Sequence, residues 1–289
     1  MSVGNPFVKS SIERSVQDLP ALPSVVMRIL KETESPTACA VTIERMLSAD
    51  QALASKVLRV VNSAYYGLSG QVVSLSQAIV ILGMQQVRNL VLSVSAYSAI
   101  KPRTPRQQET MKIFWLHSFG TAAATQFIAQ RKRFSNQDAE TAFVGGLLHD
   151  IGRLFLFSNF TQTYDQVLRF AEQKQITVES AELRLLGISH GEVGAQMAEY
   201  WKLPKPLVRM IGDHEDPTED NIDPMLYALN IADWITKDLY FDPEKIETTS
   251  PSDFVMNWLN FTPEEVDLLK EDTAEKIEEA QQVFGLLAA

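Results

Sequence analysis

Apolar residues recur at three- and four-residue intervals along nearly the whole of this 289-residue chain. Two early stretches illustrate the pattern: one helix is expected to open at Pro23, and the next follows Asp50, whose side chain can cap it. We expect the second helix to end within 62–67. Only short fragments such as 71–73 have the composition of a strand. The pattern therefore predicts an all-α fold.

Further helical stretches follow, separated by one clear break. The segment 101–106 holds two prolines and three cations, which end a helix and disfavour another. Ser189 and Glu192 form a predicted capping box, and Thr262 can cap a helix that opens with proline. The acidic segment 271–279 is expected to be a solvated face. Helices are expected over 84–100, 107–131, 137–156, 160–175, 178–186, 190–202, 205–214 and 223–240, and within the tail 251–289.

Composition narrows the classes of function. Hydrophobic residues make up 45% of the chain and the net charge is −10, so the chain has the composition of a folded, acidic protein. Nonspecific nucleic-acid binding needs a cationic surface, and nucleic acid is therefore not an expected partner. The basic triplet 131–133 is interpreted as a solvated helix end.

The sequence also indicates a compartment. Cys39 is the only cysteine, so neither an internal disulfide nor a thiolate metal cluster is expected. The N-terminus lacks an apolar core of signal-peptide length, and no apolar run is long enough for a membrane span. We therefore expect a cytoplasmic protein with no membrane partner.

The strongest chemical signal is a small group of histidines and aspartates. Asp150 follows a histidine directly, and Asp233 interrupts the apolar stretch 229–235. Imidazole nitrogens and carboxylate oxygens together form a ligand set for zinc, iron, manganese or nickel. Both aspartates are candidate metal ligands. The other candidates are the four histidines of the chain, which all lie in its middle part: His117, His149, His190 and His214.

Each candidate also has a structural alternative. His117 lies on an otherwise apolar helix side, where a core histidine bonded to a backbone carbonyl is common. Asp150 follows the apolar segment 142–148, where an ionised carboxylate is costly to bury unless paired or metal-bound; it could instead cap the next turn. Asp233 could be neutralised by an arginine or by main-chain amides.

The last two histidines are expected at helix ends, His190 at a start and His214 at a finish. The loop around His214 carries several carboxylates, and such a loop is usually only solvated. Asp213 could be an additional ligand or a carboxylate that orients a histidine.

His117, the pair His149-Asp150 and Asp233, in that order, resemble the H…HD…D signature of the HD superfamily of metal-dependent phosphohydrolases. The segment GGLLHDIGR at 145–153 is similar to the central motif of that superfamily. The resemblance spans residues from about 15 to about 235. Upstream motifs resemble its HDOD subgroup: LPALP at 19–23, SADQAL at 48–53, VLRVVNSAYYG at 57–67 and AIVILG at 78–83.

The resemblance implies a bacterial, all-helical signalling module. It implies an N-terminal helical subdomain, 1–101, packed on an HD-like metal-binding helical bundle, 102–244, with a C-terminal helical extension, 245–289. One or two divalent transition-metal ions would be bound, with iron, manganese, nickel and zinc not distinguished. The first ion would be held by His117, His149, Asp150 and Asp233, and His190 and His214 would recruit a second.

The resemblance further implies hydrolysis of a nucleotide or another phosphoester. A metal bound by Asp150 and its neighbours would activate water and polarise a phosphoryl oxygen. Arg153 could neutralise phosphate charge, or it could be an ordinary helix-face cation. The related HD-GYP cyclic-dinucleotide phosphodiesterases have the first histidine of a paired motif where Asp213 stands, and a Gly-Tyr-Pro that is missing after His214. These departures argue against cyclic-di-GMP hydrolysis.

Two other functions compete with this one. Many HDOD proteins lack the metal ligands and act through contacts with signalling proteins, so the site could be a structural metal or an empty pocket in a non-catalytic regulator. The segment 76–87 faintly resembles a helix-turn-helix. Its glycine falls one residue late for that motif, and the acidic charge disfavours DNA binding.

Overall fold

The computed structural model describes residues 6–33, 35, 37–62, 66, 68, 70–220, 222–240 and 250–287. Throughout these ranges the regular structure is helical, and the ranges contain no strand. The predicted all-α fold is therefore confirmed, and the candidate strand at 71–73 is irregular. Part of the segment 62–67 lies outside the described residues.

The chain divides into two compact units, which are described separately. The smaller unit comprises 20–100 and 275–289, and the histidine unit comprises 1–19 and 101–274. The domain boundaries expected from the sequence stay predictions.

In the smaller unit, α2 packs against α3 and α6, and α5 packs against α3, α4 and α6. The predicted cap of α4 is confirmed, because Asp50 accepts a hydrogen bond from the amide of Leu53 at 3.0 Å. Asn62, just after α4, exchanges two hydrogen bonds of 2.8 Å with the backbone of Val72. The helices of this unit are α2 (Ser24–Thr33), α3 (Ala40–Ser48), α4 (Gln51–Val61), α5 (Leu75–Leu82) and α6 (Met84–Ala99).

No described helix by itself combines the length and apolar character of a membrane span. Taken together, α5 and Met84–Ala96 reach that length and composition, but a bend of 118° separates them.

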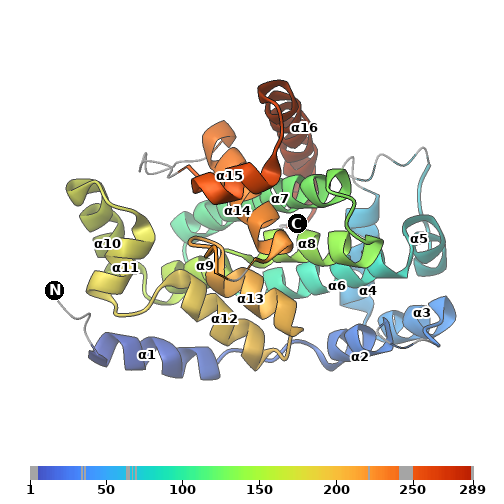
Figure 1. Cartoon of the computed structure of the whole chain (residues 1–289). Helices are drawn as coiled ribbons and strands as arrows, with labels where there is room; N and C mark the ends of the chain where they lie inside the picture. The colour runs from blue at the N-terminus through green and yellow to red at the C-terminus, as the bar shows by residue number, and fades with distance from the viewer. Residues whose placement is uncertain are drawn as a thin grey trace. The chain divides into compact units, whose positions relative to one another are not determined.

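In the histidine unit, α7 packs against α8 and α14, and α12 packs against α9, α13 and α1 (Figure 1). Helix α16 contributes its part up to residue 274. The helices are α1 (Pro6–Gln17), α7 (Pro105–Arg131), α8 (Asn136–Leu148), α9 (Ile151–Asn159), α10 (Thr161–Lys174), α11 (Val178–Leu185), α12 (His190–Tyr200), α13 (Lys205–Asp213), α14 (Pro224–Tyr240), α15 (Asp253–Leu259) and α16 (Pro263–Leu287).

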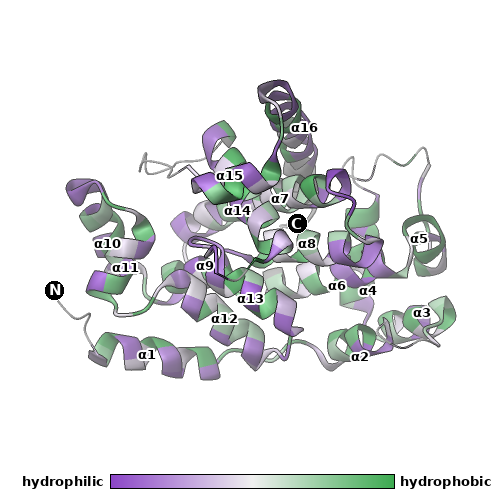
Figure 2. Ribbon diagram, viewed as in Figure 1, coloured by the Kyte–Doolittle hydropathy of each residue, from purple (hydrophilic) through white to green (hydrophobic). Residues whose placement is uncertain are grey.

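Two differences from the predicted helices concern the apolar pattern. The prediction of a continuous helix over 137–156 is wrong, because α8 ends at Leu148 and α9 begins at Ile151. The apolar pattern crosses this break unchanged because residues on both sides of it are buried. Helix α1 was not predicted. Hydrophobic and hydrophilic residues alternate along it (Figure 2), and the side that carries Ile12 and Val16 is buried.

Capping signals located the later helix starts correctly. The Ser189–Glu192 capping box at the start of α12 is present in full. Thr262 and Glu265 exchange side-chain to backbone hydrogen bonds of 2.9 and 3.2 Å at the start of α16. Each of these bonds satisfies an amide that a helix start would otherwise leave unpaired.

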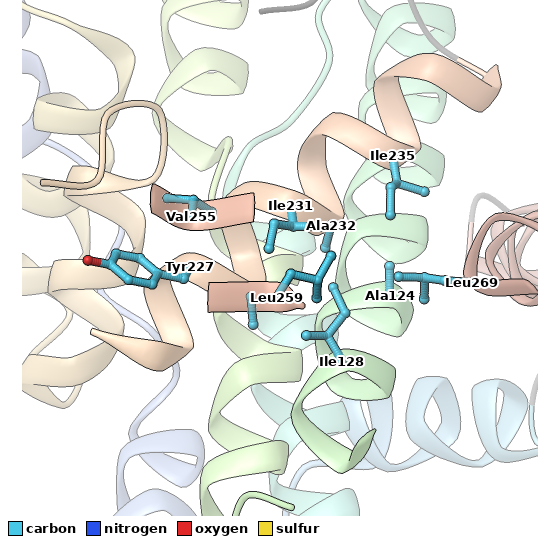
Figure 3. Packing of buried hydrophobic residues seen from close by; sticks show 10 residues of the cluster. Ala124, Ile128, Tyr227, Ile231, Ala232, Ile235, Val255, Leu259 and Leu269 are labelled. Atoms are coloured by element: carbon cyan, nitrogen blue, oxygen red, sulfur yellow. The ribbon is translucent and has the colours of Figure 1, made fainter. Parts of the chain in front are cut away.

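An apolar cluster fixes the relative positions of α7 and α14, the helices that carry His117 and Asp233. Ile231, Ala232 and Ile235 of α14 pack with Ala124 and Ile128 of α7, and α15 and α16 close the cluster (Figure 3). Burying such side chains stabilises the fold by roughly 1.5–3 kcal/mol for each large aliphatic residue. The polar side of α14 is thereby turned away from this cluster.

Two glycines let helices approach closely around the His149-Asp150 break. A Cβ added at Gly146 on α8 would lie 2.6 Å from Cα of Ala122 on α7. A Cβ added at Gly152 on α9 would overlap the backbone of His190 and lie 2.5 Å from the amide nitrogen of Gly194 on α12. Glycine is therefore needed at both positions if the four helices are to meet at this distance.

Candidate metal centre

All six candidate metal ligands come together in the histidine unit. His117 lies within α7 and Asp233 within α14, and the others lie at helix ends. The pair His149-Asp150 occupies the break between α8 and α9. His190 is the first residue of α12, and His214 follows the last residue of α13. Each of the six is at most 5% exposed.

The first half-site consists of His117, His149, Asp150 and Asp233. The Nε2 atoms of His117 and His149 lie 3.2 Å apart. Oδ1 of Asp233 is 3.0 Å from the first of these nitrogens and 3.4 Å from the second. Oδ2 of Asp150 lies 3.9 and 3.7 Å from the same two nitrogens. Two imidazoles and two carboxylates thus point toward one small volume.

The second half-site consists of Asp150, His190 and His214, with Glu215 beside them. The Nε2 atoms of the two histidines lie 3.3 Å apart. Oδ1 of Asp150 is 3.3 Å from Nε2 of His190 and 3.6 Å from Nε2 of His214. Oε1 of Glu215 lies 3.5 and 3.8 Å from these nitrogens.

Asp150 is the residue common to both half-sites. Its Oδ2 faces the first half-site and its Oδ1 faces the second. The rings of His149 and His214, one from each half-site, are 5.0 Å apart at their centroids. The geometry is therefore that of two adjoining ligand groups joined by one carboxylate.

The hydrogen bonds of three histidines establish which ring nitrogen carries the proton. Nδ1 of His149 donates to the backbone carbonyl of Gly146 at 2.7 Å, and Nδ1 of His214 donates to that of Ile211 at 2.9 Å. Nδ1 of His190 donates in the same way to the carboxylate of Glu182 at 2.7 Å. In the neutral form of each ring, Nε2 is then a bare acceptor that faces the other ligands.

Such an arrangement fits a bound cation. Bare nitrogens at 3.3 Å, as in His190 and His214, repel each other unless a proton or a metal lies between them. Within the described part of the chain, no donor makes a hydrogen bond to the buried Oδ2 of Asp150. A buried oxygen without a donor is costly, and a cation would remove that cost. The buried His and Asp groups therefore suggest a divalent metal.

Among the described residues, neither Asp150 nor Asp233 makes the alternative contacts that the sequence left open. Asp150 occupies the N-cap position of α9, but its side chain makes no capping hydrogen bond. Asp233 is neutralised by neither an arginine nor a main-chain amide in the interactions that the described residues make; its Oδ2 lies 2.7 Å from Nζ of Lys237. The same ammonium lies 3.2 Å from Oε1 of Glu215. Lys237 thus links a carboxylate of each half-site.

Local charges set the protonation of these groups. Burial alone would raise the pKa of Asp150, but the imidazoles and the guanidinium around it hold that pKa well below its usual range. Burial alone would likewise lower the pKa of His190, yet Glu182, Glu215 and Asp150 together raise it well above the usual value. The pKa of His149 is raised in the same way, because Asp150 and Asp233 outweigh its burial.

Arg153 and Asp213 have different positions relative to the centre. Nη1 of Arg153 is 3.7 Å from Oδ2 of Asp150, and its guanidinium lies over the ring of Phe114. Arg153 is therefore next to the first half-site, 16% exposed. Asp213 is 59% exposed and pairs with Arg209, so it does not join the ligands.

Three residues that contact the candidate ligands were missed by the sequence interpretation: Glu182, Glu215 and Lys237. Glu182 is fully buried, and its carboxylate is the acceptor of His190 Nδ1. Glu215 was assigned to a solvated loop, yet it approaches both histidines of the second half-site. Charged residues on helix faces are common, so the sequence pattern did not mark Glu182 or Lys237 as neighbours of the ligands.

A family model described as the HDOD domain matches residues 19–217. Among curated proteins, an uncharacterized protein of Treponema pallidum is 25% identical over 207 residues, which cover 72% of this chain and 39% of that protein. The cyclic di-GMP phosphodiesterase CdgJ of Vibrio cholerae is 24% identical over 207 residues, covering 72% of this chain and 46% of CdgJ. The chain thus spans less than half the length of these curated relatives.

Solved structures are similar over nearly the full chain. An HDOD domain protein of unknown function from Geobacter sulfurreducens is 25% identical, with a TM-score of 0.70 and 98% of each chain covered. A Shewanella amazonensis protein that carries the provisional description of a phosphohydrolase is 25% identical, with a TM-score of 0.71. That match covers 97% of this chain and 99% of the Shewanella chain.

Proposed function

The chain belongs to the HDOD domain family, and we propose that it is a metal-dependent phosphohydrolase of signal transduction that acts on a nucleotide or another phosphoester. The observation that carries this proposal is the convergence of four imidazoles on the two oxygens of Asp150. Relatives described as a cyclic di-GMP phosphodiesterase and provisionally as a phosphohydrolase support the same class of reaction.

The donor set suits one or two divalent transition-metal ions. Imidazole and carboxylate ligands together bind zinc, iron, manganese and nickel. Magnesium and calcium instead prefer sites in which every ligand atom is an oxygen. His117, His149, Asp150 and Asp233 would hold one ion, and Asp150, His190 and His214 would hold the other. Glu215 is near enough to serve the second ion. A bound ion would supply Lewis acidity for an attacking water and a phosphoryl oxygen.

Two basic residues near the centre would neutralise the negative charge of a phosphoester. Arg153 lies beside Asp150 and is partly exposed, so its guanidinium can turn toward a phosphate and bind it with two N–H groups. Lys237 is 21% exposed and pairs with both Asp233 and Glu215 between the half-sites. Both cations would offset the negative charge that three carboxylates would otherwise present to an anionic substrate.

Cyclic di-GMP is one substrate to test among several phosphoesters. CdgJ is described as its phosphodiesterase, but this chain has 24% identity to CdgJ and carries Asp213 where HD-GYP enzymes have the first histidine of a paired motif. Asp213 is exposed and paired with Arg209, and it adds no ligand to the second half-site. We therefore propose the broader substrate class.

One observation favours a second candidate, a non-catalytic regulator that works through contacts with a signalling protein. Lys237 already compensates Asp233 and Glu215, so the centre is partly neutralised without any ion. A centre of this kind could hold a structural metal, or none, while the output of the protein is a contact with a partner.

Hydrolysis, followed by chromatography of the products, separates the two functions. The metal-loaded protein is incubated with a panel of nucleotides, cyclic dinucleotides and simple phosphomonoesters, with His149→Ala and Asp150→Ala as inactive variants and Asp213→Asn as the matched control. Turnover that both variants abolish and the control retains supports hydrolysis. Stable metal binding with no turnover on any substrate supports the regulator instead.

A further inference from the structure

His190 is supported differently from the two other histidines whose Nδ1 partners are known. Nδ1 of His149 and Nδ1 of His214 donate to neutral backbone carbonyls. Nδ1 of His190 donates to Oε2 of Glu182 at 2.7 Å, and the backbone amide of His190 donates to the same oxygen at 2.7 Å. Ring and backbone of His190 are thus both attached to one carboxylate.

A tyrosine completes the surroundings of that carboxylate. The hydroxyl of Tyr164 donates to Oε1 of Glu182 at 2.6 Å. Burial, and then the adjacent carboxylate, raise the pKa of Tyr164 well above its usual value, so the hydroxyl stays a donor. Tyr164 lies on α10, Glu182 on α11 and His190 on α12, and the three side chains therefore connect three successive helices.

The charge of Glu182 needs compensation. The side chain is fully buried, and a buried carboxylate is costly unless a cation or several donors balance it. Among the described residues, His190 is the one that pairs with it as an ion-pair partner. A positive charge on the far nitrogen of this ring, at the second half-site, would meet that need through the imidazole.

We propose that Glu182 is a positioning residue that orients His190 and strengthens it as a metal donor, so that the second half-site depends on Glu182 and the first does not. This inference rests on the proposed metal centre. A carboxylate hydrogen-bonded to the outer nitrogen of a metal-bound imidazole fixes the tautomer and makes the inner nitrogen more basic. Loss of such a support typically lowers metal affinity about 10–100-fold.

The test isolates each half-site before changing Glu182. His149→Ala removes a ligand of the first half-site alone, and His214→Ala removes one of the second alone. Glu182→Gln is then added to each variant; glutamine keeps the shape and an acceptor oxygen but loses the charge. Zn²⁺ affinity is measured by competition with a chromophoric chelator.

We expect Glu182→Gln to weaken Zn²⁺ binding about 10–100-fold when only the second half-site remains. When only the first half-site remains, Glu182→Gln should change the Zn²⁺ affinity by no more than about twofold, as expected for a substitution at an independent site. Equal weakening of both half-sites, or no weakening of the second, would overturn the proposal. If the wild-type protein binds no Zn²⁺ at all, the proposed function itself fails.

Two controls separate positioning from general stability. Glu192→Gln weakens the capping box at the start of the same helix without touching the His190 ring, so it should lower thermal stability but leave the ratio of the two affinities unchanged. Tyr164→Phe keeps the charge of Glu182 and removes one donor, so its effect on the second half-site should be smaller than that of Glu182→Gln.

A measurement on the wild-type protein covers the case in which Glu182→Gln does not fold. In the Zn²⁺-loaded protein, proton NMR should place the Nδ1 proton of His190 clearly downfield of those of His149 and His214, because a carboxylate accepts it. Coincident resonances for the three protons would overturn the proposal.

Discussion

The two half-sites share Asp150 but are supported by different kinds of structure. In the first, His117 and Asp233 project from the middles of α7 and α14, which an apolar cluster holds together. In the second, both histidines lie at helix ends, and a polar chain through Glu182 holds His190. One half of the centre is thus positioned by helix packing and the other by hydrogen bonds.

The largest expected effect tests what the half-sites share. Asp150→Asn keeps the shape of the side chain and removes its charge, so both half-sites lose a ligand at once. We expect the affinity of each for Zn²⁺ to fall more than about a hundredfold, since even a supporting residue accounts for roughly 10–100-fold. Chelator competition measures this loss. Retained binding at either half-site would show that Asp150 does not bridge them.

The next effect separates the half-sites. His149→Ala should remove only the ion of the first half-site, and His214→Ala only that of the second, because each ring faces one group of ligands. In protein saturated with Zn²⁺, elemental analysis should show the metal content reduced by one ion in each variant and fully lost in the double variant. Complete loss of metal in either single variant would mean that there is only one site.

A glycine tests the packing that brings the halves together. Gly152→Ala would press a methyl group into the backbone of α12 at His190 and should destabilise the protein by about 1–3 kcal/mol. Gly70→Ala is the matched control, because its added methyl group would meet nothing within 4 Å; its effect should not exceed about 1 kcal/mol. Urea unfolding of the metal-free proteins compares them. Equal stabilities would refute the close contact between α9 and α12.

Lowering the pH should release the metal from the centre. Protons and metal compete for the same Nε2 atoms, and the pKa values of His149 and His190 are raised above the ordinary 6.5 in the metal-free protein. Protonation therefore begins above that pH as the pH falls, and metal affinity should decline from there. The favourable contribution of these protonated histidines to the metal-free protein is lost as the pH rises through their raised pKa values. The rise in melting temperature on adding Zn²⁺ should accordingly increase with pH; an unchanged rise would contradict the competition.

The smallest effect on metal binding concerns the lysine between the half-sites. Lys237→Met removes a cation from Asp233 and Glu215, so the metal-free protein should lose about 1–3 kcal/mol, less than for a fully buried pair because Lys237 is 21% exposed. Zn²⁺ should then bind several-fold more tightly, since the freed carboxylates need a cation. Weaker Zn²⁺ binding in this variant would show that Lys237 orders the ligands instead of competing with the ion.

The fold and the ligands were predictable from the sequence for different reasons. Helical periodicity runs through most of the chain, and the capping residues Asp50, Ser189 and Thr262 marked helix starts correctly. The ligands stood out because histidines are few and Asp233 interrupts an apolar face. The break at 149–150 was missed within the predicted helix 137–156, because buried residues flank it on both sides.

The supporting residues could not be predicted in this way. Glu182 and Lys237 occupy helical positions where charged side chains usually face water, and only the packing of other helices against them reveals their partners. Asp213 and Glu215 flank His214 in the same acidic loop, but one points to solvent and the other to the centre. Side-chain direction at a helix end depends on tertiary contacts that periodicity does not encode.

The most direct test of the account is the metal content of the protein purified without added metal or chelator. We predict one or two divalent transition-metal ions per chain by elemental analysis, and none in Asp150→Ala, with Asp213→Asn retaining the wild-type content. A wild-type protein that is free of metal and stays so after incubation with zinc, iron, manganese or nickel would contradict the central claim.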